Sequence, residues 1–177
     1  ALIGDLAVGF DPSGADGWEY QESLMLDWRI GAPPDHFNAE GQDWGLPPFN
    51  PLALHRHRFS PIIDTVRAVL RGFSGLRIDH VMGLMRLWLI PQGQPPSEGA
   101  YLAYPLEDLL ALLALESHRH RAVVIGEDLG TLEPWVQQLL RDRGVLGTSI
   151  LWFERREDGS IIDPEHWREL CLASVSV

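Results

Sequence analysis

The stretch Val123-Val124-Ile125-Gly126-Glu127-Asp128 is a short apolar run that ends in acidic residues, and Leu76-Arg77-Ile78-Asp79-His80 has the same form. Apolar runs of this length are typical of strands buried on both faces of a parallel sheet. A carboxylate is costly to bury without a partner. The positions of Asp79 and Glu127, each at the end of such a run, therefore indicate a catalytic pair at one edge of a sheet.

Strand and helix patterns alternate on both sides of these two runs. A helix is predicted to start at Ser60 as its N-cap, with Pro61 in the first turn and Gly72 after the last turn. Thr131 is expected to cap another helix. The remaining predicted elements are helices over residues 105–121, 131–143 and 163–170 and strands over residues 2–10, 122–126, 148–153 and from 173 onward. This alternation predicts a parallel sheet covered by helices.

The number of predicted strands favours an α/β fold of the (β/α)8 TIM-barrel type, as a partial barrel. A complete barrel takes about 250 residues, whereas four complete strands and the start of a fifth amount to about half of one. We therefore expect residues 1–177 to be a fragment of a catalytic barrel domain. Segments 11–59 and 91–104, rich in Pro and Gly, are expected to be insertions over the active site.

Composition excludes several classes of partner. The net charge is −11, and an acidic surface repels nucleic acid and anionic membranes. No apolar run approaches the ~20 residues of a membrane span. Cys171 is the only cysteine, which fits a reducing compartment such as the cytoplasm. The chain begins with Ala1 rather than Met and has no signal peptide pattern, which also suggests an excised fragment.

Two carboxylates that face one cleft suit glycoside chemistry. One attacks the anomeric carbon, while the other protonates the bridging oxygen and later removes a proton. Arg77 lies on the same strand face as Asp79, where it would hold that acid ionised and orient it. The alternative is structural: each acid caps a loop or forms an ion pair with an arginine. His80 is either a sugar ligand or an interior histidine, and Asp128 is expected to orient the backbone.

The first predicted insertion contains residues suited to sugar binding. Trp44 offers a ring face, while Asp35 and Gln42 offer hydrogen bonds to hydroxyl groups; the alternative is ordinary turn and packing chemistry. The His55-Arg56-His57 and His118-Arg119-His120 pairs lack a third ligand, so no metal site is expected. Motifs for phosphate, dinucleotide or serine-hydrolase chemistry are lacking in the sequence.

Several long motifs resemble the 4-alpha-glucanotransferases of glycoside hydrolase family 77, also called amylomaltases. Two carry most of the resemblance: Leu76-Arg77-Ile78-Asp79-His80-Val81-Met82-Gly83 and Val124-Ile125-Gly126-Glu127-Asp128-Leu129-Gly130-Thr131. Further matches are residues 31–35, 41–48, 87–91, 99–101, 115–117 and 152–154. Because they occur in the family's order along nearly the whole chain, the resemblance is specific.

The resemblance implies a (β/α)8 barrel that cuts and rejoins α-1,4-glucan chains with retention of configuration. Asp79 would be the nucleophile that forms a glucosyl-enzyme intermediate, and Glu127 would be the general acid/base. The implied substrates are maltooligosaccharides, with starch or glycogen as larger candidates. No cofactor and no metal are implied.

The resemblance also suggests substrate-binding roles. Arg77 and His80 would support the donor sugar, Gln42 and Trp44 would sit on a mobile loop that covers bound glucan, and Asp35 would lie near that loop. Asp16 falls near a sugar-binding acid of the family, although its neighbours match less well.

The end of the chain departs from the family pattern. Residues 172–177 resemble the run that leads, in the family, into a Thr-His-Asp motif with the third catalytic acid. We therefore expect this fragment to be inactive alone, and its open strand edges favour self-association. Two other functions stay open from the sequence: a hydrolase of the α-amylase clan and a glucan-binding fragment without catalysis.

Overall fold

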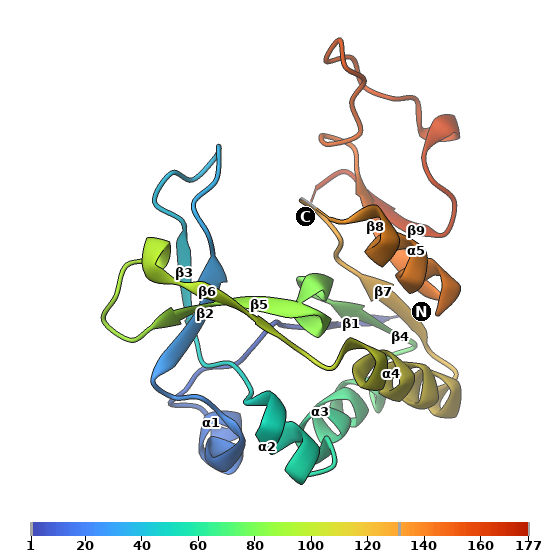
Figure 1. The fold of residues 1–177 in the computed structure, drawn as a ribbon. Coiled ribbons are helices and arrows are strands. Elements are labelled where there is room, and N and C mark those ends of the chain that lie inside the picture. The colour runs from blue at the N-terminus through green and yellow to red at the C-terminus, as the bar shows by residue number, and fades with distance from the viewer. Residues whose placement is uncertain (1, 131, 177) are drawn as a thin grey trace.

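A five-stranded parallel sheet forms one half of the molecule (Figure 1). The structure is a computed structural model that describes residues 2–130 and 132–176. The strands lie in the order β1-β4-β7-β8-β9, and every neighbouring pair is parallel. Their bounds are β1 Ile3–Leu6, β4 Gly75–Ile78, β7 Val123–Gly126, β8 Val145–Ile150 and β9 Cys171–Ser174. The prediction of a partial (β/α)8 barrel is confirmed.

Three helices cover one face of this sheet: α3 Ser60–Leu70, α4 Leu106–His120 and α5 Pro134–Asp142. Their apolar stripes meet the strand residues that point to the same side, because alternate residues of a strand share a face. The buried cluster between helices and sheet is Val66, Leu70, Leu76, Ile78, Val81, Met82, Leu110, Leu113, Ala122, Val124, Val136, Leu140 and Val145. This layer fixes the strands on which the two acids sit.

Strand register brings the two acidic strand ends together. Ile78 in β4 is the partner of Gly126 in β7. Asp79 and Glu127 each come one residue later, so both emerge at the carboxyl-terminal edge of the sheet. In parallel barrels this edge carries the functional site.

A second, antiparallel sheet lies beside the first, in the order β3-β2-β5-β6. Its strands are β2 Trp28–Ala32, β3 Gln42–Leu46, β5 Arg86–Pro91 and β6 Ala100–Ala103. The sequence did not predict this sheet: its strands come from segments that were expected to be insertions and from the residues just before the second one. A small core of Ile30, Leu87 and Leu89 holds it. That these segments cover the active site stays a prediction.

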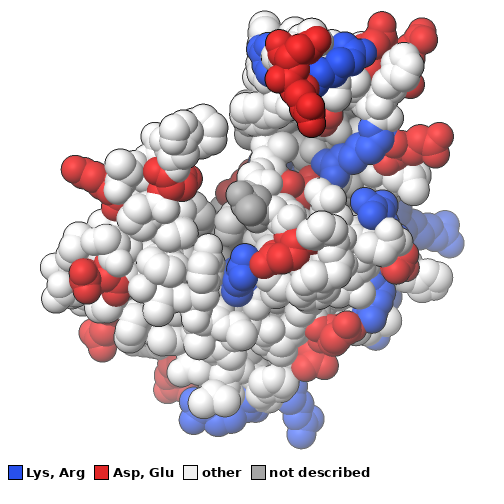
Figure 2. Space-filling view, turned by 45° about the horizontal axis from the view of Figure 1, so that its top comes forward, with Lys and Arg blue, Asp and Glu red and all other residues white. Residues whose placement is uncertain are grey.

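The remaining elements are short. They are α1 Ala15–Glu19, η1 Gln21–Ser23, α2 Pro51–Arg56, η2 Val81–Leu84, η3 Pro96–Glu98 and η4 Pro164–His166. The loop between β2 and β3 and the segment after β8 rise on the same side of the molecule (Figure 1). In the space-filling view a hollow separates these two protrusions (Figure 2). No helix among the described residues is long and apolar enough to cross a membrane.

Predicted boundaries differ from the structure at two helix starts. Ser60 was expected to be an N-cap, but it is the first residue of α3, and Phe59 precedes it with a left-handed backbone (φ 58°). The helix expected from residue 131 starts at Pro134, a residue favoured in a first turn. Thr131, its expected cap, lies outside the described residues.

Near the end of the chain, the predicted elements differ more from those in the structure. The strand expected over 148–153 is β8, which ends at Ile150, so Trp152 and Phe153 fall in the following turn. The helix expected over 163–170 is reduced to η4 Pro164–His166, and the two side chains that follow make other contacts. The Trp167 indole donates to the Ile162 carbonyl, and Arg168 reaches across to the end of β7.

Candidate active site at the ends of the parallel strands

Arg77 holds the carboxylate of Asp79. Its Nη1 donates to Oδ1 of Asp79 at 3.0 Å and to Oδ1 of Asp5 at 2.7 Å. Asp5 is the partner of Arg77 in the register of β1 and β4, so both strands contribute to this contact. The sequence predicted the Arg77–Asp79 pair but missed Asp5, because nothing in the sequence shows which strand lies beside β4.

Glu127 is held by backbone donors from two segments. Its Oε2 accepts from the His80 N–H at 3.0 Å, and its Oε1 accepts from the Leu129 N–H at 3.0 Å. Its own carbonyl accepts from the Val81 N–H at 3.0 Å. These bonds tie Glu127 to the loop that follows Asp79, so the two predicted acids occupy one site.

His80 directly follows Asp79 in this loop, and its N–H donates to Glu127. Its backbone is left-handed (φ 48°). Burial lowers the pKa of its imidazole, and the nearby charges of Glu127 and Asp79 oppose that shift without reversing it. The imidazole is therefore neutral at neutral pH, with one nitrogen able to donate and the other to accept. This is a suitable partner for a sugar hydroxyl.

Trp44 of the antiparallel sheet contacts this histidine. The two ring centroids lie 5.3 Å apart with an edge-to-face angle of 77°. The Trp44 indole N–H donates to Oε1 of Gln42 at 3.1 Å, so these two predicted sugar ligands form one unit. The structure thus brings Trp44 to the loop that follows Asp79, and Gln42 reaches that loop only through its bond to Trp44.

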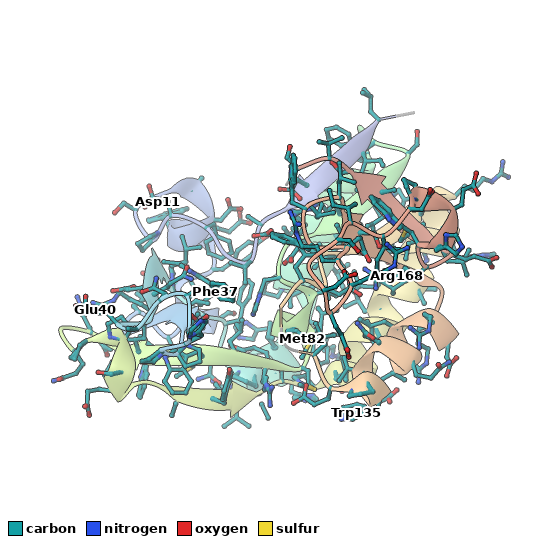
Figure 3. The ribbon with its side chains drawn as sticks, turned by 90° about the horizontal axis from the view of Figure 1, so that it is seen from above. Asp11, Phe37, Glu40, Met82, Trp135 and Arg168 are labelled. Atoms are coloured by element: carbon teal, nitrogen blue, oxygen red, sulfur yellow. The ribbon has the colours of Figure 1, made fainter. Side chains whose placement is uncertain are left out.

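Asp35 has a different environment in the loop between β2 and β3. Its Oδ1 accepts from the backbone N–H groups of Phe37 and Asn38, at 2.8 and 2.6 Å. These contacts match the turn chemistry that the sequence left open for this residue. A substrate-binding role for Asp35 stays a prediction. Seen from above, Phe37 of this same loop lies in the left half of the molecule, and Arg168 of the segment after β8 lies in the right half (Figure 3).

Asp128 turns away from Glu127 and is buried, as expected for a residue that orients the backbone. Its Oδ1 accepts from the Thr148 N–H of β8 at 2.9 Å. Both of its oxygens accept from the Arg168 guanidinium, at 2.6 and 2.7 Å. The sequence offered no signal for Arg168, which lies forty residues further along the chain.

A cavity of about 270 Å³ opens beside the first acid. Asp79 and His80 line one part of it, and Asp16 lines another. Most of the remaining lining is apolar, and it comes from both sheets, the loop after β1, α3, α4 and the segments between them. The cavity therefore gives Asp79 and His80 an apolar neighbourhood, but it offers few polar groups of its own.

Histidine pairs that could suggest a metal have other partners. Nδ1 of His57 lies 2.8 Å from the Ser23 hydroxyl, and Nδ1 of His120 lies 2.9 Å from the Glu116 carbonyl. Across residues 2–130 and 132–176, no group of three His, Cys, Asp or Glu side chains is arranged to hold a metal ion.

Comparison with known proteins agrees with these motifs. The family model described as 4-alpha-glucanotransferase, Glyco_hydro_77, matches residues 1–177. A 4-alpha-glucanotransferase of Mycobacterium bovis is 49% identical over 99% of this chain and 25% of its own length. One of Haemophilus influenzae is 44% identical over 88% of this chain and 22% of its own length. The chain thus spans about a quarter of the length of these relatives.

Two solved structures that resemble this chain are amylomaltases. Amylomaltase from Corynebacterium glutamicum superposes with a TM-score of 0.94 at 45% identity, over 99% of this chain and 25% of that one. Amylomaltase from Streptococcus agalactiae in complex with acarbose gives a TM-score of 0.85 at 26% identity, over 99% of this chain and 37% of that one.

Proposed function

The chain belongs to the 4-alpha-glucanotransferase family, glycoside hydrolase family 77, and we propose that it supplies two catalytic acids to such an enzyme. The full-length protein that contains this chain is called the parent protein below. Its proposed activity is transfer of α-1,4-glucan segments between maltodextrins with retention of configuration. The observation that carries this proposal is the pairing of Asp79 and Glu127 at one sheet edge, joined by the His80 N–H bond to Glu127.

In the first half of the proposed reaction, an oxygen of Asp79 attacks the anomeric carbon and the glycosidic bond breaks. The proton of the protonated Glu127 carboxyl goes to the departing 4-oxygen, so the leaving chain departs as a neutral alcohol. Arg77 supports the attack because its bond to one oxygen of Asp79 fixes the orientation of the carboxylate. The product is a glucosyl ester of Asp79.

In the second half, the 4-hydroxyl of an acceptor glucan attacks the same carbon and the ester bond to Asp79 breaks. The Glu127 carboxylate takes the hydroxyl proton, which restores both acids. Two inversions give net retention. Exclusion of water during this step favours transfer over hydrolysis.

The proposed sugar contacts come from both sheets. Arg77 and His80 support the donor sugar, while Gln42 and Trp44 cover the bound chain from the antiparallel sheet, with Asp35 in the adjacent loop. An aromatic ring and an amide are suited to a sugar, which has apolar faces and hydroxyl edges. The acarbose complex of the S. agalactiae relative supports an α-glucan as the ligand class.

Segments 11–59 and 91–104 belong, in this proposal, to the substrate-covering part of the site. Maltodextrin metabolism in the cytoplasm, with starch or glycogen as larger substrates, is part of the proposal too. The 177-residue chain alone is expected to be inactive and to self-associate through the edges of its parallel sheet.

Incubation of the parent protein with maltotriose tests the proposal. Transfer gives glucose together with maltodextrins longer than maltotriose, which chromatography with pulsed amperometric detection resolves. Glucose and maltose alone would identify a hydrolase instead. Binding of maltotriose without any product would identify a glucan-binding protein.

A further inference from the structure

The Arg168 guanidinium closes a clamp around the end of β7. Its Nη1 and Nη2 donate to the two oxygens of Asp128 at 2.6 and 2.7 Å. Its Nε donates to the Ser149 hydroxyl at 3.1 Å, and Nη2 also donates to the Thr148 carbonyl. All four contacts are charge-assisted because the guanidinium is ionised, and the two to Asp128 are bidentate, which makes them strong and directional.

The surroundings of the clamp are shaped for an arginine. Asp128 is only 7% exposed, and Thr148 and Ser149 are buried as well. A Cβ atom added at Gly147 would lie 2.6 Å from Cζ of Arg168, so the guanidinium sits directly against the β8 backbone. Lysine has no planar fork, so it cannot reproduce these contacts.

The clamp acts on the residue next to Glu127. On one side, the backbone of Glu127 is bonded to β4 and its loop: the Glu127 N–H donates to the Ile78 carbonyl at 2.9 Å, and the Val81 N–H donates to the Glu127 carbonyl. On the other side, Asp128 is bonded to β8 and to Arg168. The Glu127–Asp128 peptide is therefore held from both neighbouring strands.

We propose that Arg168, acting through Asp128, is a positioning residue for the general acid/base Glu127. This rests on the proposed function. The clamp keeps the end of β7 against β8. This holds the Glu127 carboxyl group in the position from which it protonates the glycosidic oxygen. Arg168 comes from the segment between η4 and β9, so it also ties the entry of β9 to the same point.

A matched control exists in the helix layer. Arg67 of α3 donates through Nε and Nη2 to the two oxygens of Glu116 in α4, both at 2.9 Å. Glu116 is 1% exposed, so this is also a bidentate arginine on a buried carboxylate. The residues next to Arg67 and Glu116 include no proposed catalytic group. Any effect common to both clamps is therefore structural.

The test compares Arg168→Lys with Arg67→Lys in the parent protein. We expect Arg168→Lys to lower kcat for maltotriose about 10- to 100-fold with KM changed less than about twofold, since small displacements of a catalytic group cost this much. The basic limb of its kcat–pH profile, which reports the general acid, should shift. Arg67→Lys should lower Tm without changing kcat or that limb.

A second donor isolates the first proton transfer. Fluoride leaves with little help from a general acid, so formation of the glucosyl ester from α-maltotriosyl fluoride depends less on Glu127 than its formation from maltotriose does. The second half, in which Glu127 acts as the base, is common to both donors, so the comparison uses the single-turnover rate of fluoride or glucose release. In Arg168→Lys the loss in this rate should be several-fold smaller with the fluoride. Equal losses of this rate with both donors, or an unchanged kcat and pH profile beside a lowered Tm, would overturn the proposal.

Two further variants keep the outcomes distinct. Glu127→Gln must lose turnover with maltotriose and retain more of the single-turnover release of fluoride; if it does not, the proposed function fails independently of Arg168. Should Arg168→Lys not fold, Asp128→Asn takes its place, because the amide oxygen still accepts the Thr148 N–H. The same results then support or overturn the positioning role.

Discussion

The parallel and antiparallel sheets contribute different things to the proposed site. In the parallel sheet, Glu127 is held by backbone N–H groups, and Asp79 is held by the guanidinium of Arg77 in β4, the strand that it follows. In the antiparallel sheet, Trp44 and Gln42 hold one another and touch the acids' loop through His80. The first arrangement fixes each carboxylate through hydrogen bonds, while the second places an aromatic ring and an amide beside the loop that follows Asp79. We infer that chemistry resides on the parallel sheet and substrate coverage on the antiparallel one.

The largest effect is expected from removing either acid of the parallel sheet. Asp79→Asn or Glu127→Gln in the parent protein is expected to lower kcat with maltotriose on the order of a thousandfold or more, because each group acts only in the bond-breaking steps. KM should change little. Circular dichroism and Tm should match the wild type, since both substitutions preserve size.

Near-normal turnover of Asp79→Asn would sink the nucleophile assignment. It would also remove the reason for placing the chemistry on the parallel sheet.

A change on the antiparallel sheet should act on binding. Trp44→Ala is expected to raise KM for maltotriose about 3- to 10-fold, the effect of losing one aromatic contact of about 0.5–1.5 kcal/mol, with kcat less affected. Steady-state kinetics on maltotriose measure both. Trp135→Ala, an exposed tryptophan on α5 in the outer helix layer, is the matched control and should leave KM unchanged.

A kcat loss larger than the KM change in Trp44→Ala would contradict the division between the sheets. It would mean that the edge-to-face contact with His80 helps to hold the catalytic loop.

The smallest effect on catalysis is expected in the helix layer. Hydrogen bonds from Arg67, and further contacts with Arg67 and Arg119, lower the pKa of Glu116 to about 2 from an ordinary 4.5. The unfolded chain therefore takes up this proton at a higher pH than the folded one. The resulting stabilisation is fully present above about pH 4.5 and is lost as the pH falls toward 2.

Glu116→Gln should accordingly destabilise the parent protein by about 1.5–3 kcal/mol at neutral pH, the range for hydrogen bonds to charged groups. Calorimetric Tm values should show that the difference from the wild type shrinks between pH 5 and pH 3. A difference that is constant over this range would mean that the ionised carboxylate is not the source of the stability. Neither kcat nor KM should change at neutral pH.

Local sequence patterns were sufficient to predict features that depend on nearby residues alone. The apolar runs ending at Gly126 and Ile78 predicted buried parallel strands, and the stripe of α3 predicted a helix with an accuracy of one residue at its start. The Arg77–Asp79 contact follows from their spacing on one strand. The helix expected over 163–170 is wrong beyond His166: the Trp167 indole donates to the Ile162 carbonyl, and Arg168 reaches Asp128, a distant partner that a local pattern cannot show.

The sequence by itself determined the parallel strands, the helices α3, α4 and α5, the family and the two acids that follow β4 and β7. Only the tertiary structure decided which strands are neighbours, and with that the partners Asp5, Trp44 and Arg168. The physical reason is that a strand's alternation and a helix's stripe are set by nearby residues, whereas pairing between distant segments depends on the packing of the whole chain. The acids and Arg77 could thus be found from the sequence, but the groups that distant segments bring to them could not.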